Sequence, residues 1–144
     1  MKLKIKKTHP DAILPTRATD GAACFDLYAL GTKKDHPSDS TATVFQTGLA
    51  FEVPRGYAML IFSRSGHGFK DAIRLSNCVG VIDSDYRGEV QVSLRFEGKH
   101  TTRPQRGERI AQFMLVASPD LELEETLALS STARGTGGFG STGA

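Results

Sequence analysis

Polar and apolar side chains alternate along the whole stretch Glu89-Val90-Gln91-Val92-Ser93-Leu94-Arg95-Phe96. A repeat of two residues is the pattern of a β-strand that buries one face. Other segments are rich in β-branched and aromatic residues, and we expect strands in them too: Val44–Val53, Tyr57–Phe62, Arg109–Val116 and Leu121–Leu129. Prolines and glycines separate these segments, where turns are expected.

No window carries a sustained apolar stripe with the helical repeat of 3.6 residues. We therefore predict an all-β chain, built as a sandwich, jelly roll or barrel, with at most one short helix after Arg64, near residues 68–72. The polar, turn-rich segment from Gly31 to Thr43 is expected to be an exposed loop. Residues 130–144 are small and glycine-rich, and we expect a flexible arm that follows a single folded domain over residues 1–129.

Bulk composition fits one ordinary globular domain. The chain has 144 residues, 39% hydrophobic and 24% charged, and a net charge of +2. It has no apolar run near the ~20 residues that span a bilayer, and its N-terminus lacks the apolar region of a signal peptide. The basic stretch at residues 2–7 alternates lysines with Leu3 and Ile5, which favours the solvent side of an edge strand over a nucleic-acid-binding arm.

Cysteine and histidine usage points to a reduced, cytoplasmic protein without a zinc site. Cys24 and Cys78 lie in different motifs, although the sequence leaves open one disulfide between them. The four histidines are scattered along the chain. Any bound metal is therefore expected to be held mainly by oxygen atoms, including those of a ligand.

Two segments combine residue types that suit a ligand-binding site. Ser63-Arg64-Ser65-Gly66 offers a planar cation, hydroxyls and a glycine that lets backbone amides approach an anion, though a plain surface turn has the same composition. The segment from Asn77 to Glu89 has two apolar arms around a polar centre, and we interpret it as a hairpin. Its Asp83 and Asp85 could be turn formers and its Tyr86 a packed aromatic; alternatively, an amide, two carboxylates and a ring form a binding site.

Three further segments hold polar residues in unusual settings. Gln112 interrupts an apolar run and must find a partner, structural or ligand, because an unpaired buried amide costs roughly 1–3 kcal/mol. Asp26 interrupts another apolar run and requires a cation or backbone donors. The tail Arg134-Gly-Thr-Gly-Gly-Phe139-Gly-Ser141 is glycine-rich but does not join a strand to a helix, so the P-loop pattern fails.

Taken together and in this order, these segments resemble the five motifs of the homotrimeric dUTP pyrophosphatases (dUTPases). The resemblance runs from Ala22 to Gly143, and its most specific parts are Gly-Val-Ile-Asp-Ser-Asp-Tyr-Arg-Gly-Glu at residues 80–89 and Arg-Gly-Thr-Gly-Gly-Phe-Gly at residues 134–140. It implies a distorted jelly-roll subunit of the β-clip type. It also implies a homotrimer with shared active sites that converts dUTP to dUMP and pyrophosphate, with no membrane or direct nucleic-acid partner.

The resemblance also implies a role for each site residue. Those expected to contact the substrate are Arg64, Ser65, Gly66, Asn77, Gly80, Val81, Ile82, Asp83, Tyr86, Gln112, Arg134, Phe139 and Ser141. Asn77 and the backbone of residues 80–82 would read uracil, and Tyr86 would pack on the deoxyribose. Arg64 and its neighbours would hold the phosphates, and the arm of another subunit would close over the ligand.

Catalysis is expected to rest on Asp83, which would activate a water for in-line attack on the α-phosphorus. Mg²⁺ would bind the triphosphate, and Asp26 would contact it indirectly, through metal-bound water. Ser63, His67 and Ala72 depart from the usual family pattern. Two rivals remain: a dCTP deaminase, although that family lacks the Asp-Tyr-Arg-Gly run and the aromatic tail, and a catalytically silent trimeric module on the same scaffold.

Overall fold

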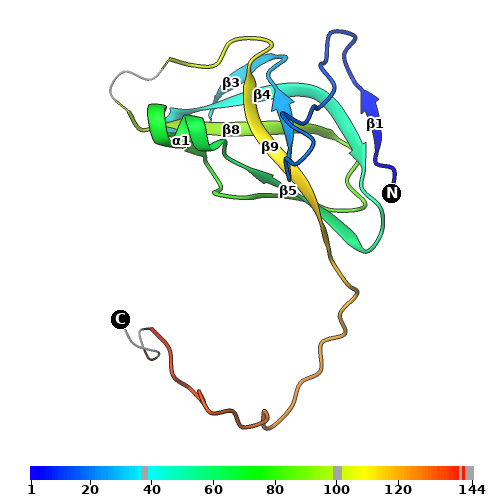
Figure 1. Cartoon of the computed structure of the whole chain (residues 1–144), viewed down its shortest axis with the longest axis vertical. Helices are drawn as coiled ribbons and strands as arrows, with labels where there is room; N and C mark the ends of the chain where they lie inside the picture. The colour runs from blue at the N-terminus through cyan, green and yellow to red at the C-terminus, as the bar shows by residue number, and fades with distance from the viewer. Residues whose placement is uncertain (37–38, 99–101, 140, 142–144) are drawn as a thin grey trace.

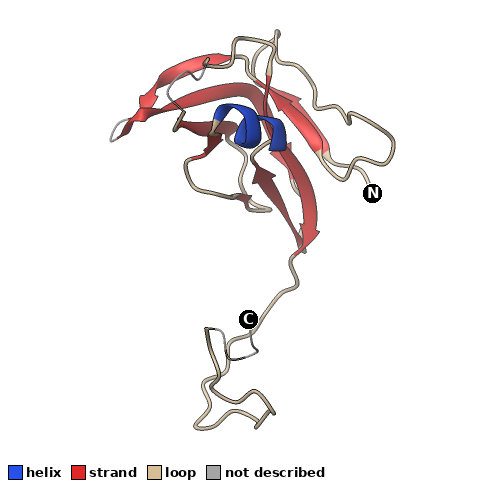
Figure 2. Ribbon diagram, turned by 60° about the vertical axis from the view of Figure 1, so that its left-hand side comes forward, coloured by secondary structure: helices blue, strands red, loops and turns tan. Residues whose placement is uncertain are grey.

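The computed structural model describes residues 1–36, 39–98, 102–139 and 141, which form two β-sheets and one short helix (Figures 1 and 2). The elements, in chain order, are β1 (Lys4–Lys7), β2 (Phe25–Tyr28), β3 (Gly31–His36), β4 (Asp39–Glu52), β5 (Tyr57–Phe62), α1 (Ser65–Asp71), β6 (Ile73–Leu75), β7 (Gly80–Ile82), β8 (Glu89–Phe96) and β9 (Arg109–Ala117). In the described part of the chain, no helix is long and apolar enough to cross a membrane.

Both sheets are antiparallel. One has the strand order β1-β4-β8-β6, with β3 also paired to β4, and the other has the order β2-β9-β5-β7. Together they form the jelly-roll arrangement, so the prediction of an all-β fold is confirmed. Helix α1 confirms the predicted short helix, although it begins directly after Arg64 and ends at Asp71.

One hydrophobic core lies between the two sheets. Val90, Val92 and Leu94 of β8 point into it with 1% of their surface exposed, while Gln91 between them is exposed. Met59 of β5 and Ile110 of β9 meet them from the other sheet with no exposed surface. The two-residue alternation that predicted β8 is thus the alternation between core and solvent.

Four strand predictions are confirmed, and the lysine stretch is an edge strand. Residues 44–52 lie in β4, and residues 57–62, 89–96 and 109–116 lie in β5, β8 and β9. Lys4, Lys6 and Lys7 lie on β1, which pairs with β4 and forms the edge of its sheet, and Lys2 precedes the strand.

The prediction of a loop over Gly31–Thr43 is wrong. β3 and the first residues of β4 form a hairpin there, with Gly31 opposite Gln46 and Asp35 opposite Thr43; residues 37 and 38 lie outside the described part. Polar composition did not prevent a strand, because the backbone of β3 pairs with β4 whatever its side chains are.

The predicted strand over Leu121–Leu129 is absent from the chain as described. Leu121, Leu123, Leu127 and Leu129 alternate as in a strand, but each is at least 81% exposed. In Figures 1 and 2 this segment runs away from both sheets. In the described part of the subunit, no strand lies beside residues 121–129 to pair with their backbone or to cover their apolar face.

The hairpin interpretation of Asn77–Glu89 is also wrong. Strand β7 pairs with β5 in one sheet, whereas β8 pairs with β4 and β6 in the other. Residues 83–88 therefore form a turn that crosses from sheet to sheet, which we call the crossover turn. The local pattern marked two strands and a turn, but the choice of partner is a long-range property.

Candidate active site

Strand register brings Asp26, Phe62 and Gln112 into one row. Gln112 of β9 lies opposite Asp26 of β2 on one side and opposite Phe62 of β5 on the other. Strand β5 ends there, and the chain continues through Ser63 and Arg64 into α1. Residues far apart in sequence thereby meet at one end of the four-stranded sheet.

Asp26 is the centre of this cluster. Its residue is 8% exposed, and its two carboxylate oxygens accept from two arginines: Oδ1 from Nε of Arg64 at 3.2 Å, and Oδ2 from Nη1 of Arg109 at 3.3 Å. The sequence predicts a cation or backbone donors beside Asp26, and the structure places two arginine cations there. Arg64 also donates from Nη1 to the carbonyl oxygen of Arg109 at 3.5 Å. The carboxylate thereby fixes the positions of both guanidinium groups.

Gln112 has a structural partner. Its Nε2 donates to the carbonyl oxygen of Ser63 at 3.0 Å, and the Ser63 hydroxyl accepts from the backbone N–H of Leu75 at 2.9 Å. Ser63, a departure from the family pattern, therefore ties the turn before α1 to β6. The structure places Gln112 where it fixes this turn, and its side-chain oxygen remains an acceptor.

A cavity of about 240 Å³ opens beside the cluster. Five of the residues predicted to face phosphates or metal line it, namely Asp26, Arg64, Ser65, Gly66 and Gln112. Arg109 and Cys24 line it as well, and no sequence motif marks either of them as a site residue. Burial, followed by the charge of Asp26, raises the pKa of the Cys24 thiol.

The sequence around Arg109 gives little indication that this residue contacts Asp26. Arg109 is the first residue of a predicted strand, and simple alternation places it on the opposite face from Gln112 three residues later. The register between β2 and β9 shifts between Leu27 and Tyr28. The contact between Arg109 and Asp26 depends on this irregular pairing of β2 with β9.

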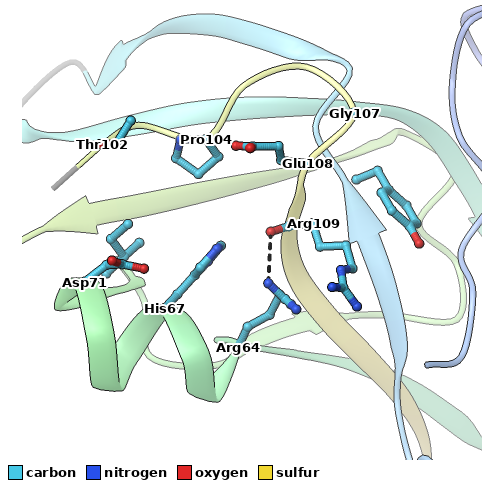
Figure 3. A pocket seen from close by; sticks show the side chains of 10 residues that line it. Arg64, His67, Asp71, Thr102, Pro104, Gly107, Glu108 and Arg109 are labelled. Carbon is cyan, nitrogen blue, oxygen red and sulfur yellow. Dashed lines mark hydrogen bonds between the residues drawn. The ribbon is translucent and has the colours of Figure 1, made fainter. Parts of the chain in front are cut away.

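Figure 3 shows a second cavity, of about 410 Å³, that shares Arg64 and Arg109 with the first. His67 of α1 projects into it, with Asp71 and Glu108 nearby. Nδ1 of His67 is buried and lacks a hydrogen-bond partner among the described residues. Burial, followed by the positive charge of Arg64, lowers the pKa of His67.

The residues predicted to bind the base and sugar form a separate group around β7. Gly80, Val81 and Ile82 pair with Ile61, Leu60 and Met59 of β5. A Cβ at position 80 would lie 3.1 Å from Cβ of Ile61, a tight contact at which the neighbouring strand would have to shift by a few tenths of an ångström. Asn77, Asp83 and Tyr86 flank β7 and are exposed.

Asp83 and the Asp26 cluster lie apart in one chain. Ile82 is opposite Met59, and Gln112 is opposite Phe62 on the same strand. With a rise of ~3.3 Å per residue and ~4.8 Å between strands, the Cα atoms of Ile82 and Gln112 are about 14 Å apart. Asp83 and Arg64 continue from these points in opposite directions, so they are farther apart still. Asp83 lines a different cavity, of about 500 Å³, with Arg55, Tyr57 and Arg87.

The predicted arm residues form a third group. Arg134 donates from Nε to the carbonyl oxygen of Gly137 at 2.9 Å, and the N–H of Ser141 donates to the carbonyl oxygen of Gly138 at 2.8 Å. Phe139 is fully exposed. These local turns lie away from both sheets (Figures 1 and 2). The structure thus divides the predicted site residues into three separate groups.

Comparison with known proteins gives a consistent result. The dUTPase family model matches residues 10–143. The deoxyuridine 5'-triphosphate nucleotidohydrolase of Nautilia profundicola is 43% identical over 143 residues, covering 99% of both chains. That of Wolinella succinogenes is 41% identical, covering 99% of this chain and 95% of its own.

Among solved structures, the dUTPase of Staphylococcus bacteriophage 80alpha, as a G164S mutant with dUpNHpp, superposes with a TM-score of 0.83. It is 26% identical, and the match covers 99% of each chain. The motifs, the jelly-roll fold and these full-length matches agree, and the chain belongs to the dUTPase family.

Proposed function

We propose that this protein hydrolyses dUTP to dUMP and pyrophosphate at sites that several copies of the chain build together as a homotrimer. Such an activity limits the incorporation of uracil into DNA and supplies dUMP for thymidylate synthesis. The full-length relatives bear the name of this activity, and the segments that match the family motifs are all present.

The proposal of a shared site rests on one observation: within one chain, the three groups of predicted site residues lie apart. Arg64 and Gln112 belong to one cavity, Asp83 to another, and Phe139 to an exposed arm. In-line hydrolysis requires the catalytic base and the phosphate-binding groups within hydrogen-bond reach of the same nucleotide. Joining groups from neighbouring subunits meets this requirement, and the exposed leucines of residues 121–129 favour association.

Base and sugar are assigned to the group around β7. Asn77 and the free backbone groups of Gly80, Val81 and Ile82 would read the edge of uracil, because β7 is the outer strand of its sheet. A closed slot there would exclude the 5-methyl group of thymine. Tyr86 would pack on the deoxyribose and leave no room for a 2′-hydroxyl.

Phosphates are assigned to the Asp26 cluster and to the arm. Arg64, Ser65, Gly66 and Gln112 line one cavity, and Arg64 offers the planar cation that suits phosphate oxygens. From a neighbouring subunit, Arg134 and Ser141 would add contacts to the phosphate chain, and Phe139 would stack over uracil. Closure of the arm would exclude water from the site.

Asp83 is proposed as the general base. Its carboxylate would orient and deprotonate a water for attack on the α-phosphorus, with pyrophosphate as the leaving group. A positioned base contributes typically ~10²–10⁴-fold to the rate. Arg64 and Arg134 would stabilise the charge on the phosphates during the transfer.

The donor set fits Mg²⁺ that arrives with the nucleotide. Among the described residues, no group of three or more histidine, cysteine or acidic side chains could hold a metal ion. Mg²⁺ keeps several waters and binds phosphates readily, where it neutralises their charge. Asp26 accepts one hydrogen bond on each oxygen, so a lone pair remains on each for a metal-bound water.

The cytoplasm is the proposed compartment. Cys24 and Cys78 are both free thiols. Thiols of this kind persist in a reducing compartment.

Pyrophosphate release from dUTP, UTP and dTTP, each with Mg²⁺, is the test. The proposal expects release from dUTP and at most slow release from the other two. Ammonia release from dCTP would instead indicate the deaminase. No product from any nucleotide, with a folded protein, would indicate the silent binding module.

A further inference from the structure

The crossover turn holds the ring of Tyr86 through several contacts, and some of them come from residues that have no role in the mechanism above. Tyr86 is 44% exposed, yet its hydroxyl donates to the carbonyl oxygen of Glu89 at 3.1 Å. Its backbone N–H donates to the carbonyl oxygen of Asp83 at 3.3 Å and closes the turn. The ring and the proposed base are therefore parts of one small, hydrogen-bonded unit.

Gly88 lies directly against this ring. A Cβ at position 88 would overlap the Tyr86 hydroxyl oxygen and would lie 2.6 Å from Cζ and 3.0 Å from Cε2. The φ angle of Gly88 is outside the left-handed region, so its backbone could accept any residue. What glycine supplies at this position is room for the Tyr86 ring.

Arg87 fixes the backbone on which the ring stands. Its Nη1 donates to two carbonyl oxygens, that of Ser84 at 2.8 Å and that of Tyr86 at 2.9 Å. One guanidinium nitrogen therefore bridges the start and the middle of the turn. Methionine would keep most of the apolar length of the side chain but could make neither bond.

Glu89 ties the same unit to the core sheet. Its Oε1 accepts from the backbone N–H of Gly48 at 2.9 Å. Beside it, the buried hydroxyl of Thr47 donates to the carbonyl oxygen of Val90 at 2.6 Å. The carbonyl that accepts from Tyr86 is thus held by β4, a strand with three partners.

We propose that Gly88, supported by Arg87 and Glu89, is a specificity-determining residue that sets the position of the Tyr86 ring and thereby the choice of 2′-deoxyribose over ribose. This inference rests on the proposed function, because it assumes that Tyr86 packs on the sugar. A 2′-hydroxyl adds one oxygen atom, so a ring displacement of that size decides whether UTP fits.

The expected effect of Gly88→Ala follows from which group can move. The new Cβ meets the far end of a side chain rather than backbone, so the ring shifts and the fold survives. The shift breaks the hydrogen bond to Glu89 and opens the space beside the sugar. Gly31→Ala is the matched control, since a Cβ at position 31 meets nothing within 4 Å and its φ is not in the left-handed region.

The measurement is kcat/KM for dUTP and for UTP in the wild-type protein and both variants, with thermal melting to verify folding. We expect Gly88→Ala to lower the ratio of the two kcat/KM values by about tenfold or more. Gly31→Ala should leave the ratio unchanged. A folded Gly88→Ala protein with the wild-type ratio overturns the inference.

A double-mutant cycle with Tyr86→Ala tests whether Gly88 acts through the ring. Tyr86→Ala removes all three atoms that a Cβ at position 88 would meet most closely, so adding Gly88→Ala to Tyr86→Ala should change the ratio by less than about threefold. If Gly88→Ala changes the ratio by the same factor whether or not the Tyr86 ring is present, the inference is wrong. If Gly88→Ala does not fold, Arg87→Met decides: loss of both hydrogen bonds should lower the ratio about threefold or more in a folded protein, and an unchanged ratio overturns the inference.

These outcomes are separable from failure of the proposed function. A folded wild-type protein that releases no pyrophosphate from dUTP refutes the activity itself. A wild-type protein that is active and selective, with a selectivity that Gly88→Ala does not alter, refutes only the role of Gly88.

Discussion

Asp26 and Asp83 are both carboxylates of the candidate site, but their surroundings give them different chemistry. Asp26 is buried and paired with two guanidinium groups, which holds it as a fixed anion that orients Arg64 and Arg109. Asp83 is exposed at the start of the crossover turn, where a water can reach it. The buried carboxylate fixes two guanidinium groups, and the exposed one is accessible to solvent.

Replacing Asp83 with asparagine tests its role as the base. The amide keeps the shape but cannot accept the proton, so we expect turnover to fall by about 10²–10⁴-fold while nucleotide affinity persists. Asp85→Asn, two residues along the same turn, is the control and should retain most of the activity. Calorimetric titration with a non-hydrolysable dUTP analogue, together with turnover, separates the two effects. Near-normal turnover in Asp83→Asn would refute the assignment.

His67 is expected to make stability depend on pH. Burial and Arg64 lower its pKa in the folded chain below the ordinary value, whereas the unfolded chain keeps the ordinary value, near 6.5. As pH falls below ~6.5 the unfolded chain takes up the proton first, so the contribution of His67 to stability is present above that pH and lost as pH falls through the folded pKa. The neighbouring charges that act on the imidazole are Arg64, Asp71, Glu108 and Arg109.

His67→Leu should therefore stabilise the protein more at pH 5 than at pH 8, and it also removes a buried nitrogen without a partner. Urea unfolding at a series of pH values measures this difference. A constant difference between variant and wild type across the series would show that His67 does not titrate differently in the folded state.

At the scale of elements, β4 is the strand on which the five-stranded sheet depends. Between its pairs Gln46–Gln91 and Ala50–Glu89, residues 47–49 lie opposite the single residue Val90. Gly48 adopts a left-handed conformation there, with φ of 67°. This bulge turns the N–H of Gly48 toward Glu89 and its carbonyl toward the N–H of Thr8.

Gly48→Ala should destabilise the fold strongly. Its Cβ would lie 2.8 Å from Cβ of Ala12 and 2.9 Å from Cδ2 of Leu30. A left-handed alanine costs roughly 1 kcal/mol and overpacking about 1–3 kcal/mol, so we expect a loss of about 2–4 kcal/mol. Urea unfolding at fixed protein concentration measures it, with Gly31→Ala as the control. A loss below about 0.5 kcal/mol would mean that the bulge adapts without strain.

At the scale of the whole molecule, the chain leaves the two sheets shortly after β9. The N–H of Ser118 still donates to the carbonyl oxygen of Gly56 at 2.8 Å, and Asp120 pairs with Arg55 at 3.2 Å. Beyond them, the leucines between residues 121 and 129 are exposed, and the described part of the arm lies away from both sheets (Figure 1). An alternating, exposed apolar segment is suited to join another chain as an added strand. The unit that functions is therefore expected to be larger than one chain.

Deleting residues 130–144 should abolish most turnover and leave a folded assembly. The deletion removes Arg134, Phe139 and Ser141 but nothing of the core. Size-exclusion chromatography with light scattering measures the assembly, thermal melting measures the folding, and pyrophosphate release measures the turnover. Wild-type activity in the truncated protein would refute the arm's role as a lid.

Mixing two inactive proteins tests whether sites are shared. Co-expression of Asp83→Asn chains with chains that lack residues 130–144 should restore part of the activity, because some sites then combine an intact Asp83 with an intact arm from another subunit. If both groups came from the same chain, no mixed assembly could recover activity. Each protein alone, at the same total concentration, is the control.

The elements whose signal is local can be predicted from the order of the amino acids. The alternation of residues 89–96 and the apolar run of residues 57–62 correspond to β8 and β5, and the motif composition led to the correct family. Asp26 and Gln112 were recognisable because a polar group in an apolar strand must have a partner, and the structure provides one for each.

Which strands pair, and therefore which residues form the site, depends on contacts between distant parts of the chain. These contacts assign β7 and β8 to different sheets, make a strand pair within residues 31–43, and bring Arg109 to Asp26, while residues 121–129 pair with no strand in the described part of the subunit. The physical reason is that side-chain alternation is encoded within a few residues, whereas sheet pairing joins backbone groups that the chain sequence places far apart.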